Sequence, residues 1–163
     1  MNNKLSWECA GFIVFRHYEK NLEVLLSQDK KKQYPIDFPK GRLELDGTYF
    51  EAACRNFMKE TGISASDIWV QGSYVTESCN FDTTRYYVAI ARFGDPSYSQ
   101  DLSYNCGWKK VQDVEKINWR REQILSERLA LMKQAENIVR YHSGQFYPTA
   151  EMRFIEGPVH IME

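Results

Sequence analysis

Apolar and polar residues form distinct blocks in the N-terminal part of the chain. The segment Cys9–Phe15 is rich in Ala, Ile, Val and Phe, and Glu23–Ser27 contains Val-Leu-Leu. Short apolar runs with β-branched and aromatic residues are typical of strands. The polar residues Glu19–Asn21 lie between the two runs, so we predict a β-hairpin. The run Asp37–Gly41, D-F-P-K-G, follows, and its Pro and Gly predict a break in regular structure.

A helix is predicted over Thr48–Glu60 from three independent signals. Thr48 and Glu51 have the spacing of a capping box. Apolar residues recur at i, i+3 and i+7, at Phe50, Ala53 and Phe57. Gly62 stands where a helix of this length would end. The capping residues, the apolar face and the C-terminal glycine thus predict the same helix.

The rest of the pattern predicts further strands and helices in one α/β domain. Strands are expected over Ile68–Ser73 and over Arg85–Phe93, which contains Tyr-Tyr-Val. A short strand at Gly107–Lys109 leads to a brief helix near Val111–Ile117. A long helix is expected from Arg120 to about Tyr141, and its broad apolar face predicts packing on the sheet.

We predict a single domain over residues 1–144, followed by a C-terminal extension or arm over residues 145–163. A chain of 163 residues that is 43% hydrophobic can form one core of ordinary size. The extension contains Pro148 and Pro158, which favour an extended course. Two interpretations stay open for it: an arm laid over the body of the domain, or an arm laid over a second subunit.

Net charge and cysteine spacing give no indication of nucleic-acid binding or of a zinc site. The formal net charge is −1, which is too balanced to predict nucleic-acid binding from electrostatics. The four cysteines show no C-x-x-C spacing, so a zinc site is not expected. The sequence contains no apolar run long enough to predict a membrane span, and it contains no signal-peptide pattern. We therefore expect a cytoplasmic protein without a membrane partner.

The segment Gly41–Ile63 reads G-R-L-E-L-D-G-T-Y-F-E-A-A-C-R-N-F-M-K-E-T-G-I. It resembles the Nudix box, G-x5-E-x7-R-E-U-x-E-E-x-G-U, in which U is an apolar residue. The matching positions are Gly41, Arg55, Phe57, Glu60, Gly62 and Ile63. Pro39-Lys40-Gly41 and Tyr86 also look like the diadenosine tetraphosphate hydrolase subgroup. The resemblance implies an α/β/α sandwich: a mixed, curved sheet with the box helix on one face and the C-terminal helix on the other.

The box is degenerate at three acidic positions. Gly47, Asn56 and Lys59 stand where the family has glutamates, and Glu60 is the acidic position that survives. In the family these carboxylates bind metal and activate water. Asn56, Lys59 and Glu60 are spaced to share one helix face. Because Mg²⁺ prefers carboxylate oxygens, the Lys59 ammonium would repel it, and the Asn56 amide cannot act as a base.

The resemblance leaves Glu60 as the metal candidate, and Mg²⁺ or Mn²⁺ is expected only if hydrolase activity persists. Other carboxylates lie in segments that could approach the site: Glu44, Asp46, Glu51, Glu77, Asp82 and Asp101. No spacing among them predicts a rebuilt metal site. We predict structural roles for four residues of the box: Gly41, Gly47, Arg55 and Gly62. Arg55 is expected to pair with Glu51, one helical turn earlier.

Candidate substrate-binding residues are the cations Lys40, Arg42 and Lys59, together with Tyr86, which could stack on a base. Alternating strand residues point to opposite faces, so one of Tyr86 and Tyr87 is expected in the core, and structural use of both is favoured over stacking.

Three functions follow from these residues. The preferred one is a catalytically impaired domain that binds a nucleotide, an RNA end or a protein partner. The alternatives are an active hydrolase of dinucleoside polyphosphates or capped RNA, and a dimerisation or interaction module.

Overall fold

The computed structural model describes residues 7–29, 36–45, 47–79, 82–91, 104–116, 122–142 and 145–156. The strands in these ranges are β1 (Trp7–Tyr18), β2 (Asn21–Asp29), β3 (Ile36–Asp37), β4 (Lys40–Arg42), β5 (Ile68–Cys79), β6 (Asp82–Ala91), β7 (Tyr104–Lys110) and β8 (Tyr147–Pro148). The helices are α1 (Tyr49–Thr61), α2 (Glu122–His142) and α3 (Thr149–Glu156), with the 3-10 helices η1 (Ala65–Asp67) and η2 (Val111–Lys116). No described helix has the length and apolar character needed to cross a membrane.

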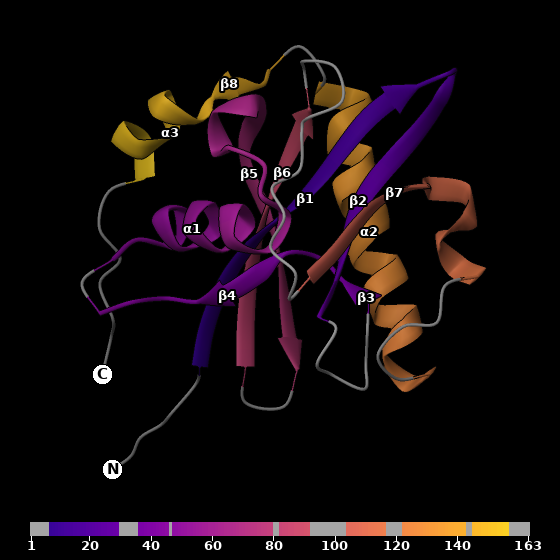
Figure 1. Ribbon diagram of the computed structural model, residues 1–163, viewed down its shortest axis with the longest axis horizontal. Coiled ribbons are helices and arrows are strands. Elements are labelled where there is room, and N and C mark those ends of the chain that lie inside the picture. Colours follow the sequence, from indigo (N-terminus) through magenta and orange to yellow (C-terminus); the bar gives the residue numbers. More distant parts are fainter. Residues whose placement is uncertain are drawn as a thin grey trace.

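The described strands form one mixed sheet in the order β3-β2-β1-β6-β5-β8, with β4 beside β1 and β7 beside β2. β1 and β6 are parallel, whereas β1 and β2 and β5 and β6 are antiparallel. Figure 1 shows α1 on one face of the sheet and α2 on the other. The predicted α/β/α sandwich is therefore confirmed.

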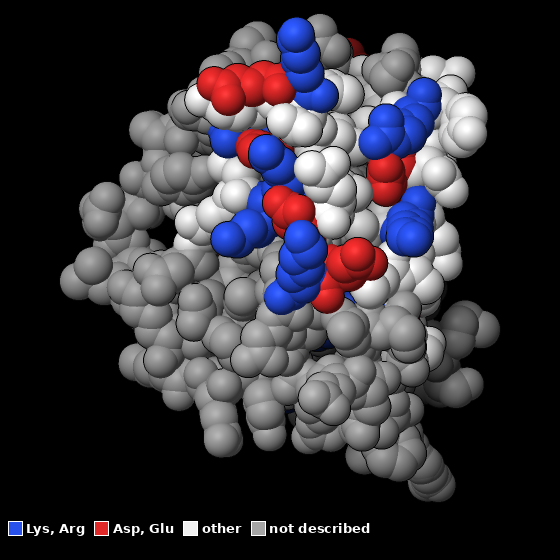
Figure 2. All heavy atoms as spheres, turned by 90° about the vertical axis from the view of Figure 1, so that its right-hand side faces the viewer, with Lys and Arg blue, Asp and Glu red and all other residues white. Residues whose placement is uncertain are grey.

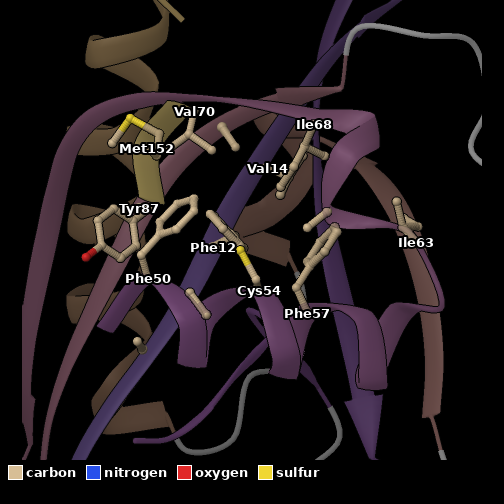
Figure 3. Packing of buried hydrophobic residues seen from close by; sticks show 14 of the residues in the cluster. Phe12, Val14, Phe50, Cys54, Phe57, Ile63, Ile68, Val70, Tyr87 and Met152 are labelled. Carbon is tan, nitrogen blue, oxygen red and sulfur yellow. The ribbon is translucent and has the colours of Figure 1, made fainter. Parts of the chain in front are cut away.

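Two apolar clusters fill the space between the sheet and its helices. On the α1 side, Phe50 and Phe57 pack edge-on against Phe12 of β1, with ring centroids 5.8 and 5.5 Å apart (Figure 3). On the α2 side, the cluster includes Leu131, Met132, Ala135 and Val139 of α2 and Phe15, Val24 and Val88 of the sheet. Neighbouring residues of β6 serve opposite clusters: Tyr87 lies on the α1 side and Tyr86 on the α2 side. Both rings are buried because both faces of the sheet are covered.

The predicted hairpin is confirmed, but its strands stay paired only near the turn. Glu19 and Lys20 form the two-residue turn with φ of 47° and 71°, as a type I′ turn requires. The ladder between β1 and β2 runs from Tyr18↔Asn21 to Phe15↔Val24. Farther from the turn, β1 pairs with β4 and β2 pairs with β3, while β7 pairs with β2 along its length from Glu23 to Asp29. The hairpin strands therefore diverge and take different neighbours.

The D-F-P-K-G run lies where the hairpin strands diverge. The prediction that this run has no regular structure is wrong at both ends of the run, because β3 ends at Asp37 and β4 begins at Lys40. Between them Phe38 is fully buried, and the carbonyl of Pro39 accepts a hydrogen bond from the Phe12 amide at 3.2 Å. Proline donates no hydrogen bond, but its carbonyl can still join a ladder. This run is thereby held against β1.

β5 is longer than the prediction of Ile68–Ser73. Its pairing with β6 shifts register between Val70 and Tyr74. Gly72 lies in the shift with φ of 39°, a conformation that favours glycine. The shift interrupts the alternation of buried and exposed side chains. The hydrophobic pattern therefore did not predict the second half of the strand. In that half, Val75 and Glu77 are buried.

The C-terminal segment differs from the predicted extended arm. β8 pairs with β5 at the edge of the sheet. Residues 149–156 form α3, and Met152 of this helix is 2% exposed within the α1-side cluster. Apolar side chains of the segment are therefore buried against its own chain. Residues 157–163 lie outside the described ranges.

Candidate functional site

The signature helix α1 begins and ends where its capping residues predict. The Thr48 hydroxyl accepts a hydrogen bond from the Glu51 amide at 3.0 Å. Gly62 adopts φ of 73° and its N–H donates to the Met58 carbonyl at 2.9 Å. A left-handed residue at this position closes a helix and is least strained as glycine. These caps set the rotation of the helix and hence which side chains face β2 and β4.

Gly41 allows the loop before α1 to approach the helix closely. A Cβ atom at this position would overlap the Asn56 side chain. Asn56 itself donates from Nδ2 to the Ala52 carbonyl at 2.8 Å, one turn back in the same helix. The Asn56 side chain is therefore engaged in contacts within α1 and lies close to Gly41 of β4.

Arg55 ties α1 to the same loop, but its partners differ from the prediction. The guanidinium donates to the Arg42 carbonyl at 2.9 Å and lies 3.5 Å from the Glu44 carboxylate. The expected pairing with Glu51 is wrong, because the Glu51 carboxylate accepts from the Thr48 hydroxyl instead, at 3.3 Å. The chain turns between residues 44 and 47, with a Gly47 N–H to Glu44 carbonyl bond of 3.1 Å, and this turn brings Glu44 to the arginine.

Glu60 accepts a hydrogen bond from a protein donor at each of its two carboxylate oxygens. Oε1 accepts from the Ser27 hydroxyl at 2.9 Å, and Oε2 accepts from the Lys40 amide at 3.3 Å. Burial, together with the nearby charge of Asp37, raises the pKa of Glu60 from 4.5 to about 7, although the two hydrogen bonds oppose the shift. A substantial fraction of this carboxyl group is therefore protonated at neutral pH.

The second buried charged group of this region is the guanidinium of Arg128. Arg128 of α2 is 2.8 Å from Glu77 of β5 and 3.1 Å from Asp37 of β3, and its Nη1 donates to the Tyr86 hydroxyl at 3.1 Å. Burial disfavours the charged guanidinium, but Tyr86, Asp37 and Glu77 more than compensate and raise the pKa of Arg128. Burial also raises the pKa of Tyr86 well above its usual value. Arg128 is thus a fully charged cation in the interior.

Asp37 connects the two groups. Its Oδ2 lies 3.1 Å from Arg128 Nη2 and 4.0 Å from Lys40 Nζ, and its Oδ1 accepts from the Phe38 amide at 2.8 Å. Its charge also acts on the titration of Glu60. We call the whole set the polar cluster; its members are Ser27, Asp37, Lys40, Glu60, Glu77, Tyr86 and Arg128. Strands β2 to β6 and both large helices contribute to it.

The structure brings some of the predicted site residues into this cluster and leaves others outside it. Lys40 and Glu60 belong to it. Tyr86 joins through its hydroxyl, but its ring is fully buried and offers no exposed face on which a base could stack. Lys59 is exposed and makes no ion pair with a described residue, and Arg42 is exposed at the end of β4.

The described residues do not fit a Mg²⁺ or Mn²⁺ site. They contain no group of three His, Cys, Asp or Glu side chains that could hold a metal ion. Among the other candidate carboxylates, Glu44 and Glu51 are exposed, and Glu77 is paired with Arg128. Asp46 and Asp101 lie outside the described residues, as does the side chain of Asp82. A hard divalent cation prefers several carboxylate oxygens, and at Asp37, Glu60 and Glu77 it would compete with the protein's own donors.

Sequence reasoning missed Ser27, Asp37 and Arg128. One signal for Arg128 was present, since it precedes Leu131, Met132 and Ala135 by three, four and seven positions on the apolar face of α2. A charged residue on such a face requires a buried partner. The sequence could not show that the partners come from β3, β5 and β6.

A separate hollow lies between the β1–β2 turn, η2 and α2. Its volume is about 270 Å³, with an apolar floor that includes Leu22 and Met132 and a rim that includes Glu136 and Arg140. Two of the lining charges are paired, with Arg140 2.7 Å from Glu136. Figure 2 shows basic and acidic side chains interspersed on the face it views. This mixture does not indicate a surface for a polyanion.

No family model matches the sequence, and no curated protein sequence matches it. Solved structures match the fold. An Ap4A hydrolase from C. elegans aligns with a TM-score of 0.66 and 18% identity, over 83% of this chain and 99% of that chain. The Nudix domain of NrtR from Shewanella oneidensis, complexed with ADP ribose, aligns with a TM-score of 0.65 and 18% identity, over 84% and 90%. A Nudix hydrolase from M. smegmatis, RenU, aligns with a TM-score of 0.64 and 14% identity, over 83% of this chain and 87% of that chain.

These matches agree with the resemblance read from the box. At such low identity they establish the fold, and the chain has the Nudix fold. What the similar proteins bind or cleave is a property of their own sites.

Proposed function

We propose that this Nudix-fold domain is a catalytically impaired member of its fold, a pseudoenzyme that binds an anionic nucleotide group without a divalent cation. The nucleotide would be free or at the end of an RNA. One observation carries the proposal: α1 presents Asn56 and Lys59 at two acid positions, while the carboxylate of Glu60 is held by Ser27 and by the Lys40 amide.

The cations around Glu60 support the choice of an anionic ligand. Lys59 is the next residue in α1 and is exposed, and the Lys40 backbone contacts the Glu60 carboxylate. Arg42 is exposed at the end of β4, the strand that begins at Lys40. Ammonium and guanidinium groups bind phosphate oxygens directly, whereas a metal-dependent site needs carboxylates in these places. The likeness to proteins named for Ap4A and ADP ribose supports a nucleotide over other anions.

Hydrolysis is the first test. The natural chain, Asn56→Glu/Lys59→Glu and Glu60→Gln are incubated with Ap4A, ADP-ribose, nucleoside triphosphates and capped RNA, with Mg²⁺ or Mn²⁺. We expect no turnover by the natural chain and a gain by the double variant, which restores two acids. Turnover by the natural chain that Glu60→Gln abolishes would establish an active hydrolase and overturn the proposal.

Binding is the second test. Affinity for ATP and ADP-ribose should persist in EDTA and fall as salt rises, because the contacts are electrostatic and lie near the surface. Lys59→Ala should weaken binding, whereas Lys133→Ala should leave it unchanged, because Lys133 is an equally exposed lysine on α2. Affinity that requires Mg²⁺ would contradict metal-free binding. Failure to bind any nucleotide, with a stable protein complex formed instead, would favour a protein partner.

A further inference from the structure

Arg128 lies at the centre of the polar cluster and contacts a member from three different strands. We propose that Arg128 is the resident counter-cation of this cluster: its guanidinium holds Asp37 and Glu77 together where other charge-balanced sites use a divalent cation, and it keeps such a cation out. The inference deepens the proposed function and rests on its loss of metal-dependent chemistry. It assigns that loss partly to a residue outside the box.

The contacts of the carboxylates are the first argument. Both oxygens of Asp37 have protein donors, the Phe38 amide and Arg128 Nη2. Both oxygens of Glu60 have donors in Ser27 and the Lys40 amide. Arg128 Nη1 lies 2.8 Å from Glu77 Oε1. A divalent cation at Asp37 or Glu60 would have to compete with these donors, and at Glu77 with the Arg128 guanidinium.

Electrostatics is the second argument. The side chains of Arg128 and Glu77 are 5% and 8% exposed, so water contributes little to their screening. A guanidinium does not lose its proton in proteins, and it therefore cannot make room for a metal by neutralising itself. A divalent cation entering the cluster would meet this fixed positive charge, together with the Lys40 ammonium 4.0 Å from Asp37.

The position of Arg128 in α2 is the third argument. The neighbouring positions of the same helix face are occupied by the apolar residues Leu131, Met132 and Ala135, which pack on the sheet. An apolar residue at position 128 would suffice for helix packing, since buried ion pairs add little net stability over apolar contacts. What an apolar residue could not do is neutralise Asp37 and Glu77. This neutralisation distinguishes a counter-cation from a residue that only fixes the helix.

The test replaces the cation and then offers a divalent ion. Arg128→Met and the matched variant Arg140→Met, an exposed arginine on the same helix, are melted in EDTA and in increasing MnCl₂. We expect Mn²⁺ to raise the Tm of Arg128→Met by several degrees in a concentration-dependent manner, because the ion replaces the lost charge. The natural chain and Arg140→Met should not respond. Arg128→Lys, which keeps a cation, should respond weakly or not at all.

Two outcomes would overturn the inference. If Arg128→Met folds but ignores Mn²⁺, Arg128 serves packing alone. If the natural chain itself is stabilised by Mn²⁺ and the amides of Phe38 and Lys40 broaden in its NMR spectrum, a divalent ion enters despite Arg128. The NMR titration needs only the natural chain, so it decides the matter even if Arg128→Met does not fold. Mn²⁺-dependent hydrolysis by the natural chain would instead overturn the proposed function, so the two failures are distinguishable.

Discussion

The guanidinium of Arg128 lies 2.8 Å from the carboxylate of Glu77, and both side chains are almost fully buried. Arg128 belongs to α2 and Glu77 to the far half of β5, beyond its register shift. The ion pair therefore links α2, which covers one face of the sheet, to β5, a strand of the same sheet. Its loss should affect the stability of the whole domain as well as the chemistry of the polar cluster.

Arg128→Met should lower the free energy of unfolding by about 3 to 5 kcal/mol in a metal-free buffer, because it leaves two carboxylates without their buried partner. Urea denaturation measures the change. Arg140→Met removes an arginine from a surface ion pair with Glu136 and should cost no more than about 1 kcal/mol. Equal losses in the two variants would show that the buried pair contributes no more than the exposed one.

The raised pKa of Glu60, about 7, predicts a pH-dependent stability. In the unfolded chain this carboxyl ionises near 4.5, so between about pH 4.5 and 7 the folded state holds the proton more tightly. Its contribution is fully present below pH 4.5 and is lost as the pH rises through 7. The advantage of Glu60→Gln over the natural chain should therefore grow by roughly 3 kcal/mol across this interval. A gap between the two unfolding free energies that does not change with pH would contradict the shift.

Gly41→Ala should destabilise the domain by about 1 to 3 kcal/mol, because the added methyl group overlaps the Asn56 side chain. The double variant Gly41→Ala/Asn56→Ala removes the overlapping atoms and should recover much of that loss. A thermodynamic cycle of the four proteins measures the coupling. Additive effects would place the constraint on Gly41 in its backbone and not in the Asn56 contact.

Met152→Ala should destabilise the domain by about 2 to 5 kcal/mol, because Met152 of α3 is 2% exposed in the α1-side cluster. Met58→Ala is the matched control, since Met58 of α1 is 47% exposed. Thermal or urea unfolding compares the two. If both variants are as stable as the natural chain, α3 does not contribute to the core, and the idea of an arm for a second subunit should be tested by sedimentation.

Much of the fold could be predicted because its signals are local. Thr48, Glu51 and Gly62 determine both ends of α1 through contacts within a few residues. The turn at Glu19 and Lys20 joins neighbouring strands, and the apolar face of α2 repeats every turn of its own helix. Interactions of this kind depend on spacing along the chain, and spacing is visible in the sequence.

The predictions that failed involve residues brought together from separate segments. Arg55 contacts Glu44 across the turn at Gly47, although Glu51 has the better spacing in the helix. β3 and β4 form because β1 and β2 diverge, which no local pattern of the D-F-P-K-G run indicates. By contrast, structural use of both Tyr86 and Tyr87, which the sequence favoured over stacking, agrees with their burial under the helices on the two faces of the sheet.

The sequence by itself determined the Nudix-like order of elements and the presence of Asn56 and Lys59 beside Glu60 on α1. Only the tertiary structure decided what surrounds the remaining acid: Ser27 and Lys40 at Glu60, and Arg128 with Asp37 and Glu77 beside it. The physical reason is that the free energy of a buried charge depends on every group within a few ångströms. Those groups come from strands and helices that are distant in the chain, and folding alone makes them neighbours.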